Sequence, residues 1–377
     1  MCKLCKIAQN TLFALYLRPK VDFGNPLVMN SHPSNVAPII ASSALKAPWQ
    51  QQLADISISA KAFLLQLELP TSLLSAGEKG AQDFPIRVPL AFLNRIKKGD
   101  INDPLLRQIW PLLEETQTPP TGFVLDPLGE ASSNTTPGIV HKYKNRVLLV
   151  VNGSCAIHCR YCFRRHFPYD ENRLSRQQWL DTLEYIQQRP EINEVIFSGG
   201  DPLSSSDKRL FDLLEAIEAI PHVKRLRIHS RLPIVIPDRI TPELIQRLTS
   251  SRLKIIMVVH ANHANEIDND VGNTLQTMKR AGIHVLNQSV LLKGVNDNAQ
   301  SLIDLSERLF EFDTLPYYLH LLDPVVGAHH FDVSESVATQ LLLDIQKTLP
   351  GFLVPKLVRE VDGRPSKTLI PIKSHPA

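Results

Sequence analysis

The sequence predicts an α/β fold in which strands and helices alternate around a parallel sheet. Short β-rich runs and amphipathic helical stretches follow one another through six units after Lys142. Uncommon polar residues follow these strands, as expected where the carboxyl ends of parallel strands carry a site. The chain has 377 residues and is 43% hydrophobic, which is enough for a large buried core. Periodicity alone does not distinguish an open barrel from a doubly wound sheet.

The six predicted strands are short apolar runs bounded by turn residues. They cover residues 146–152, 194–198, 225–229, 253–260, 284–291 and 317–322. Apolar residues at helical spacing predict the connecting helices. These cover residues 175–189, 206–220, 241–250, 268–281 and 298–312. This alternation predicts βαβ units and therefore parallel strand pairs.

Three further regions lie outside these units. Residues 1–45 are predicted to form a flexible tail, or in part to precede a start at Met29. Residues 46–140 carry several helical patterns, beginning with "WQQQLADISISAKAFLLQLEL", and predict a helical N-terminal subdomain. We assign residues 141–325 to the barrel core and residues 326–377 to a C-terminal segment.

The composition disfavours several classes of protein. The formal net charge of +3 is small and argues against a dedicated nucleic-acid-binding surface. No apolar run reaches the roughly 18 residues that a membrane span needs. The five cysteines are odd in number and three are clustered, which is not a disulfide framework. We therefore expect a reducing, cytoplasmic setting with no membrane or nucleic-acid partner, and no role for Cys2 and Cys5.

Three cysteines lie close together in the segment "GSCAIHCRYCFRRHF". Cys155, Cys159 and Cys162 offer three thiolates, whereas structural zinc and most 4Fe–4S clusters take a full set of four ligands. Three thiolates on a 4Fe–4S cluster would leave one iron open for an exogenous ligand. The alternative is a zinc site completed by His158 or His166.

The spacing C-x3-C-x-aromatic-C, with Tyr161 as the aromatic residue, resembles the radical S-adenosylmethionine (SAM) enzymes. This resemblance implies a partial (β/α)6 barrel, and a 4Fe–4S cluster whose open iron binds SAM to generate a 5′-deoxyadenosyl radical. The segment "SGGDP" resembles the family's element that binds the SAM amino group, and its glycines permit close backbone approach. The residues implied are Ser198, Gly199, Gly200 and Asp201.

A closer resemblance covers most of the chain. The stretches "HKYKNRVLL", "CRYCFRRHF", "SGGDPL", "LNQSVLLKGVND", "PYYLHLLD" and "PSKT", in this order, resemble the lysine 2,3-aminomutases. Among these enzymes, the chain most resembles the short branch that makes β-lysine for modifying elongation factor P. The resemblance implies pyridoxal 5′-phosphate (PLP) as a second cofactor, held by Lys367 as a Schiff base. It also implies pyridoxal contacts for Tyr143 and Arg146, and SAM contacts for His260 and Gln288.

Three residues are implied to hold the substrate at its two ends. Arg164 corresponds to an arginine that binds the substrate carboxylate, because a guanidinium can form two parallel hydrogen bonds with it. Asp323 corresponds to an acid that binds the ε-ammonium. The family's second such acid is an Asp seven residues before the pyridoxal lysine, and here that position is Glu360. The implied activity is that of an isomerase, L-lysine 2,3-aminomutase producing (R)-β-lysine.

Three alternatives stay open from the sequence. They are an aminomutase for glutamate or arginine, a PLP-independent radical enzyme that modifies RNA, and a non-enzymatic metal-stabilised module. Asp323 and Glu360 disfavour glutamate, whose side chain would need a cation. The resemblance also implies an electron donor such as flavodoxin or ferredoxin, a functional link to elongation factor P and its lysine ligase, and a homo-oligomer.

Overall fold

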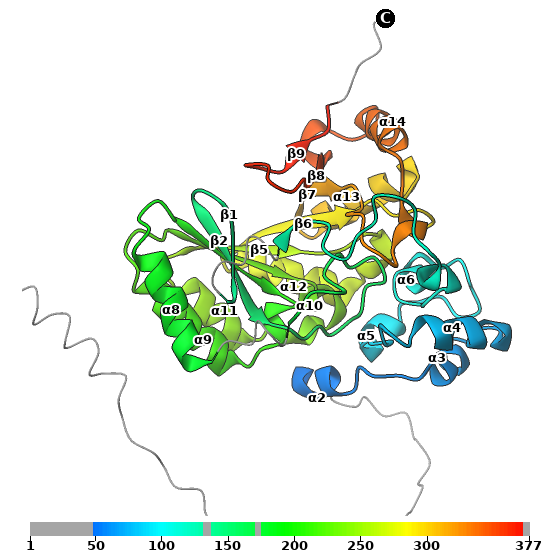
Figure 1. Ribbon diagram of the computed structural model, residues 1–377, viewed down its shortest axis with the longest axis horizontal. Helices are drawn as coiled ribbons and strands as arrows, with labels where there is room; N and C mark the ends of the chain where they lie inside the picture. The colour runs from blue at the N-terminus through cyan, green and yellow to red at the C-terminus, as the bar shows by residue number, and fades with distance from the viewer. Residues whose placement is uncertain (1–47, 131–136, 170–174, 372–377) are drawn as a thin grey trace, which may run out of the picture. The chain divides into compact units, whose positions relative to one another are not determined.

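The computed structural model describes residues 48–371, apart from 131–136 and 170–174. Its centre is a mixed sheet of nine strands that lie in the same order as in the chain (Figure 1). The expectations for residues 1–45, including those for Cys2 and Cys5, fall outside the described residues.

All six predicted strands form, as β2 to β7. The strands are β1 (Ile139–Tyr143), β2 (Arg146–Asn152), β3 (Glu194–Gly199), β4 (Arg225–Ser230), β5 (Lys254–Val259), β6 (His284–Val290), β7 (Leu315–His320), β8 (Lys356–Arg359) and β9 (Thr368–Leu369). Strands β2 to β8 pair in parallel, whereas β1 and β9 pair antiparallel at the two edges.

The strand order decides between the two architectures that the sequence left open. A doubly wound sheet reverses its strand order at a switch point, but here consecutive strands are neighbours throughout. The winding is therefore that of a barrel, and it is partial because β1 and β9 each pair with one neighbour. This confirms the predicted α/β partial barrel.

The predicted connecting helices also form, and Figure 1 shows several of them along one side of the sheet. The helices after β2 are α8 (Arg176–Gln187), α9 (Asp207–Glu218), α10 (Leu232–Val235), α11 (Pro242–Thr249), α12 (Asn269–Arg280), α13 (Ala299–Glu311) and α14 (Glu335–Gln346). Each of the longer ones begins after a side chain that accepts a hydrogen bond from the first helical turn, as at Ser206, Asp268 and Asn298. Ser175 and Gln178 form a capping box at α8.

The N-terminal part is helical, but its helices are shorter than the periodicity predicts. They are α2 (Trp49–Ala54), α3 (Ala60–Gln66), α4 (Leu74–Gly80), α5 (Leu90–Leu93) and α6 (Pro104–Arg107). The run that begins at Trp49 breaks between α2 and α3, where Ser57 forms a β-bridge with Arg87 and Ile56 is buried. Alternation of Ile and Ser suits an extended segment better than a helix.

Single-turn 3-10 helices fill several connections. They are η1 (Thr71–Leu73), η2 (Leu113–Thr116), η3 (Pro202–Ser204), η4 (Pro237–Arg239), η5 (Ala264–Glu266), η6 (His329–Phe331) and η7 (Gly351–Leu353). None of the helices in the described residues is long and apolar enough to cross a membrane.

The sheet continues beyond residue 325, where the sequence analysis placed the end of the barrel core. Helix α14 and strand β8 form one more unit, and β8 pairs in parallel with β7. Leu342 and Ile345 of α14 share a buried cluster with Leu319 of β7 and Leu357 of β8. The described part of the C-terminal segment therefore belongs to the barrel wall, and this places Lys367, just before β9, beside the site.

The two faces of the strands differ in a way that positions the site. Residues facing the helices, such as Leu149, Phe197 and Met257, are almost fully buried in the main core. Alternate residues point the other way and line a cavity on the concave face, as at Arg227 and Gln288. The period of two along each strand thus separates the core from the site.

Candidate active site

A cavity of about 800 Å³ lies on the concave face of the sheet. This volume is in the upper part of the range for small-molecule sites, about 300–1,000 Å³. It brings together all the residues that the resemblance implies as cluster, cofactor or substrate contacts. Its lining includes Tyr143, Arg146, Cys155, Cys159, Cys162, Arg164, Ser198, Gly199, Gly200, Asp201, His260, Gln288, Asp323, Glu360 and Lys367.

The three cysteines lie in the loop after β2, are partly buried and face this cavity. Burial raises the pKa of Cys155, and the neighbouring thiols raise it further. Burial also raises the pKa of Cys162 to about 12, with Cys159 adding to the shift. Three thiolates so close together need a cationic group to ionise. The donor set therefore fits an iron–sulfur cluster with three thiolate ligands.

Each of the two histidines that a zinc site would use has one ring nitrogen at a backbone carbonyl oxygen, which leaves its other ring nitrogen for an ion. His158 is joined through Nδ1 to the carbonyl oxygen of Pro85 at 2.8 Å, and His166 through Nε2 to that of Val326 at 3.1 Å. In the part of the chain that the structure describes, no three His, Cys, Asp or Glu side chains are arranged for one bound ion. A four-iron cluster is wider than one ion, so its thiolates stand farther apart.

A buried arginine contacts one of the cysteines. Arg231, which follows β4, donates from Nη1 to Cys159 Sγ at 2.6 Å and to the Tyr161 hydroxyl at 2.8 Å. Its Nη2 donates to Gln108 and to Glu266. Because the guanidinium is fixed on several sides, it places a permanent positive charge beside the Cys159 sulfur.

The cysteine loop is anchored to the N-terminal part by a buried ion network. Arg160 is fully buried and binds both oxygens of Glu115 through Nε at 2.9 and 3.1 Å. Arg165 also donates to Glu115, at 3.0 Å. Both guanidinium groups lie over the ring of Phe84. The two arginines flank Cys162 in the sequence, so this network holds the loop that bears it.

The two glycines of "SGGDP" pack against the cysteine loop. A Cβ on Gly199, whose φ is +119°, would lie 2.4 Å from the carbonyl oxygen of Asn152. A Cβ on Gly200 would lie 2.6 Å from that of Ser154. The Gly200 N–H donates to Asn152 O at 2.7 Å. The glycines therefore allow the turn after β3 to contact the backbone that leads into Cys155.

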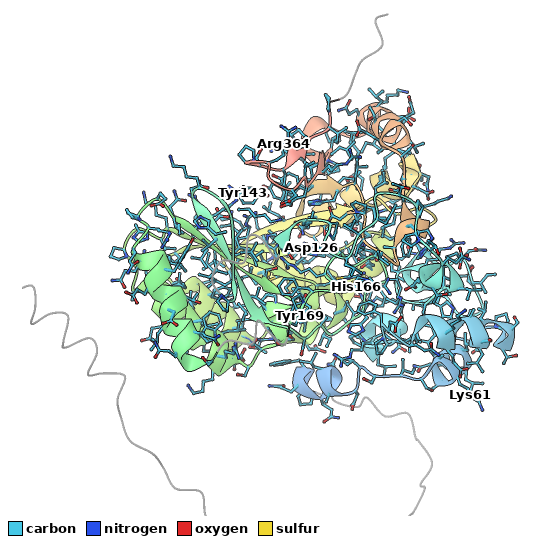
Figure 2. The ribbon with its side chains drawn as sticks, viewed as in Figure 1. Lys61, Asp126, Tyr143, His166, Tyr169 and Arg364 are labelled. Atoms are coloured by element: carbon cyan, nitrogen blue, oxygen red, sulfur yellow. The ribbon has the colours of Figure 1, made fainter. Side chains whose placement is uncertain are left out.

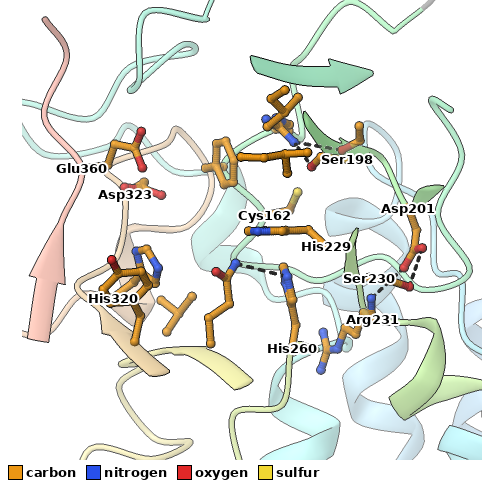
Figure 3. A pocket seen from close by; sticks show the side chains of 18 of the residues that line it. Cys162, Ser198, Asp201, His229, Ser230, Arg231, His260, His320, Asp323 and Glu360 are labelled. Atoms are coloured by element: carbon orange, nitrogen blue, oxygen red, sulfur yellow. Dashed lines mark hydrogen bonds between the residues drawn. The ribbon is translucent and has the colours of Figure 1, made fainter. Parts of the chain in front are cut away.

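Asp201, which the resemblance implies as a SAM contact, lines the cavity and is also hydrogen-bonded within the chain. Its carboxylate accepts hydrogen bonds from Ser230 Oγ at 2.7 Å and from the backbone N–H groups of Leu203, Arg231 and Leu232 at 2.7–3.1 Å (Figure 3). Burial raises its pKa to about 6, against the opposing effect of these hydrogen bonds. With its oxygens engaged, Asp201 joins the turns after β3 and β4 and positions them.

Arg164 lines the cavity, but its guanidinium already holds a carboxylate. Nε and Nη2 donate to the two oxygens of Glu130 at 2.8 and 2.7 Å, while Nη1 donates to Ser198 Oγ and Gly199 O. Burial opposes the charge of Arg164, but Glu130 outweighs it and raises the pKa. The guanidinium has five N–H groups. Four of them make these hydrogen bonds, and one N–H on Nη2 is left to donate to a ligand. The expected two-point grip on a substrate carboxylate would therefore require Glu130 to move.

The opposite side of the cavity carries two acids, Asp323 and Glu360 (Figure 3), and Lys367 also belongs to the lining. Lys367 Nζ donates to Glu360 Oε2, and the Tyr143 hydroxyl donates to Glu360 Oε1 at 2.8 Å. The ring of Tyr143, which is labelled in Figure 2, also lies against the guanidinium of Arg146. The central carbon of the guanidinium is 4.0 Å from the ring centre. Oδ1 of Asp323 is buried and has no hydrogen-bond partner among the described residues. An unpaired buried carboxylate oxygen is a site for a cation.

Uncharged imidazoles line the cavity between these regions. His260 Nε2 is 3.1 Å from the side-chain amide of Gln288 (Figure 3), and the two rings of His229 and His260 meet edge to face. Burial lowers the pKa of His260 to about 3 and that of His229 and His320 well below their usual value. Nε2 of His229 and of His320 has no partner within the described residues. These rings are therefore neutral groups free to hydrogen-bond a ligand.

Several lining residues were not assigned from the sequence. His229 and Arg231 belong to "HSR" and His320 to "PYYLHLLD", so their positions after or within strands were visible, but not their contacts. Glu130 lies in an irregular connection with no periodic signal. Arg225 and Arg227 also line the cavity. Both form ion pairs with Glu194, which lines the same cavity, at 3.2 and 2.6 Å.

Comparison with known proteins agrees with this geometry. The model of the Radical SAM superfamily matches residues 149–305. The chain is 50% identical to the L-lysine 2,3-aminomutase of Escherichia coli (strain K12), over 85% of this chain and 93% of that protein. It is 48% identical to the enzyme of the same name from Haemophilus influenzae, over 85% of this chain and 95% of that protein.

More distant relatives carry the same name. The L-lysine 2,3-aminomutase of Clostridium subterminale is 34% identical over 74% of this chain and 66% of that protein. A crystal structure of Streptococcus suis SuiB bound to precursor peptide SuiA aligns with 58% of this chain and 49% of that chain. Its sequence identity is 14% and its TM-score 0.41, so it adds nothing to the assignment. On the sequence relatives, the chain belongs to the L-lysine 2,3-aminomutase family of radical SAM enzymes, isomerases that use a 4Fe–4S cluster, SAM and PLP.

Proposed function

We propose that this enzyme converts L-α-lysine to (R)-β-lysine by moving the α-amino group to the neighbouring carbon. The observation that carries the proposal is Asp323, a buried carboxyl group with an oxygen that has no partner among the described residues, on the wall of the cavity that Lys367 and the three cysteines also line. Such a group favours a substrate with a cationic side chain.

The charges at the two ends of the cavity support lysine over glutamate. A glutamate side chain would meet Asp323 and Glu360, and like charges repel. The α-carboxylate has Arg164 available, through its remaining Nη2 N–H or in place of Glu130. Arginine also has a cationic side chain, and it is the second candidate substrate because the acids alone do not select between the two cations.

The cofactors supply radical generation and an electron sink when they are bound. The chain's own residues hold and orient the reacting groups. We assign cluster ligation to Cys155, Cys159 and Cys162, and covalent attachment of PLP to Lys367. The remaining cofactor contacts are assigned to Tyr143, Arg146, Ser198, Gly199, Gly200, His260 and Gln288, with Asp201 positioning the turns.

The wider setting is also proposed. Because the sequence resembles the short branch of the family, we infer that β-lysine is made for elongation factor P and its lysine ligase. A flavodoxin or ferredoxin would reduce the cluster, in the cytoplasm, and the enzyme would act as a homo-oligomer.

One experiment tests the activity. The reconstituted enzyme is incubated anaerobically with reductant, SAM, PLP and either lysine, arginine or glutamate, and the products are separated by chiral chromatography. We expect (R)-β-lysine from lysine and no β-amino acid from glutamate. Faster conversion of arginine than of lysine would reject the substrate assignment.

A further inference from the structure

A glutamine from the N-terminal part of the chain lies behind the cavity wall that carries the cysteines. Gln108 is the C-cap residue of helix α6, and it is 0% exposed. Its backbone carbonyl oxygen accepts a hydrogen bond from the N–H of Arg160 at 2.9 Å, in the segment between Cys159 and Cys162. Because a buried side-chain amide needs hydrogen-bond partners of its own, the contacts of this amide show what it holds.

Both ends of the Gln108 side chain are engaged. Oε1 accepts from Arg231 Nη2 at 2.7 Å and from Asn262 Nδ2 at 3.0 Å. Nε2 donates to Glu266 Oε1 at 3.0 Å and to the carbonyl oxygen of Pro104 at 3.1 Å. A neutral amide supplies an acceptor and two donors at once, and this one uses all of them. Its orientation is therefore fixed.

Two of these partners belong to the cysteine end of the cavity. Arg231 (labelled in Figure 3) and Asn262 line it together with the three cysteines. Both donate to the hydroxyl of Tyr161, at 2.8 and 2.6 Å, and Tyr161 lies between Cys159 and Cys162 in the sequence. None of the atoms in these contacts belongs to a cysteine, so ligation of a cluster replaces none of them.

The positive charge of Arg231 is consequently held in one place. Its Nη2 is shared between Gln108 and Glu266, at 2.7 and 2.9 Å, and its side chain is only 7% exposed. Reduction adds a negative charge to an iron–sulfur cluster, and a fixed cation nearby favours the reduced state. An arginine that was free to turn away from the cysteine loop would favour it less.

We propose that Gln108 is a positioning residue for the iron–sulfur cluster: its side-chain amide holds Arg231 and Asn262 in place, so that the guanidinium charge favours reduction of the cluster. The step concerned is the transfer of one electron from an external reductant to the cluster. The helical N-terminal part thus contributes to the chemistry as well as to the fold. The proposal rests on ligation of the cluster by the three cysteines, as proposed above.

Two substitutions test the amide. Gln108→Leu removes its acceptor and its donors together. Gln108→Glu keeps the acceptor, but its second oxygen would lie where Nε2 is, 3.0 Å from Glu266 Oε1. Two carboxylates this close do not both ionise, so at low pH a carboxyl proton replaces the amide N–H, and at higher pH the two charges repel. The other charged groups facing this point are Arg231 and Arg95, which donates from Nη1 to the carbonyl oxygen of Glu266.

The reconstituted proteins are compared at equal iron content and without lysine. A redox titration followed by electron paramagnetic resonance (EPR) gives the midpoint potential of the cluster, and 5′-deoxyadenosine gives the rate of SAM cleavage with dithionite. Gln246→Leu and Gln246→Glu, at an exposed position of α11, are the matched controls and should equal the parent.

We expect Gln108→Leu to have a more negative midpoint potential and to cleave SAM about 10- to 100-fold more slowly. The rate of Gln108→Glu, divided by that of the parent at the same pH, should approach one at low pH. It should fall as the pH rises, because the proton that replaces the amide N–H is lost.

Two results would overturn the proposal. One is a midpoint potential of Gln108→Leu equal to that of the parent, and the other is a rate ratio of Gln108→Glu that does not change with pH. If Gln108→Leu fails to fold, the pH dependence of Gln108→Glu decides. Lysine takes no part in these measurements, so a different substrate leaves the test valid, whereas a parent without the EPR signal of a four-iron cluster would refute the ligation and the proposal together.

Discussion

Removing Glu115 should destabilise the enzyme and loosen its cysteine loop. The carboxylate is the shared partner of Arg160 and Arg165, whose side chains are 0% and 5% exposed. Glu115→Ala would leave two buried guanidinium groups without their counter-ion. Breaking a buried ion pair by deleting one partner costs about 3–5 kcal/mol. The backbone carbonyl groups of Gly80 and Phe84, which also accept from Arg160, limit the loss to that range.

The cost converts into a measurable shift in thermal unfolding. For a unit that spans Ala47–Ala377, the entropy of unfolding is about 0.7 kcal/mol per kelvin. Glu115→Ala should therefore lower the Tm by about 4–7 °C when unfolding is reversible, as followed by circular dichroism on anaerobic protein. The exposed neighbour supplies the control, because Glu114→Ala should shift the Tm by less than about 1 °C. Equal Tm values for the two variants would refute the reasoning that the buried network holds the loop.

The remaining predictions concern the site itself. Cys159→Ala should abolish SAM cleavage, measured as 5′-deoxyadenosine, and full activity in that variant would exclude a cluster held by three cysteines. Borohydride should fix PLP on the peptide containing Lys367, so labelling of another lysine would reject the assignment. Gly200→Ala should lower the iron content per chain, because the new Cβ would lie 2.6 Å from Ser154 O and push the cysteine loop away; unchanged iron content would contradict this contact. The ratio of lysine affinity to the affinity for L-norleucine, which lacks the ε-ammonium, should fall below about pH 7, where Asp323 is protonated and neutral because burial raises its pKa to about 7; a ratio that does not change with pH would argue against Asp323 as the ammonium ligand.

Elements that depend on local patterns were predictable from the sequence. The six strands β2 to β7 and the helices between them follow from apolar periodicity and from capping residues such as Ser206 and Asn298. The cysteine spacing was equally visible, because all three thiols come from one short loop. The resemblance to known enzymes then added Lys367 and Glu360, which are seven residues apart, and Asp323 from a separate segment; all three line the same cavity.

The alternation of apolar residues was too short in the last two strands, β8 and β9, to predict them from the sequence. Strand β8 has four residues and β9 has two, so alternation cannot be recognised in them. Their pairing with β7 and with each other is set by hydrogen bonds to a neighbouring strand. The break after α2 has a related cause, because Ser57 pairs with Arg87 from a distant segment.

The sequence by itself determined which residue types reach the site, because side chains at the ends of parallel strands must gather at one edge of the sheet. Only the tertiary structure decided which partner each of them has. Arg164 holds Glu130, and Glu360 holds Lys367, while one oxygen of Asp323 has no partner in residues 48–371 as far as the structure describes them. The physical reason is that the charge state of a buried group depends on its neighbours within a few ångströms. Those neighbours come from segments that the fold, and no local pattern, brings together.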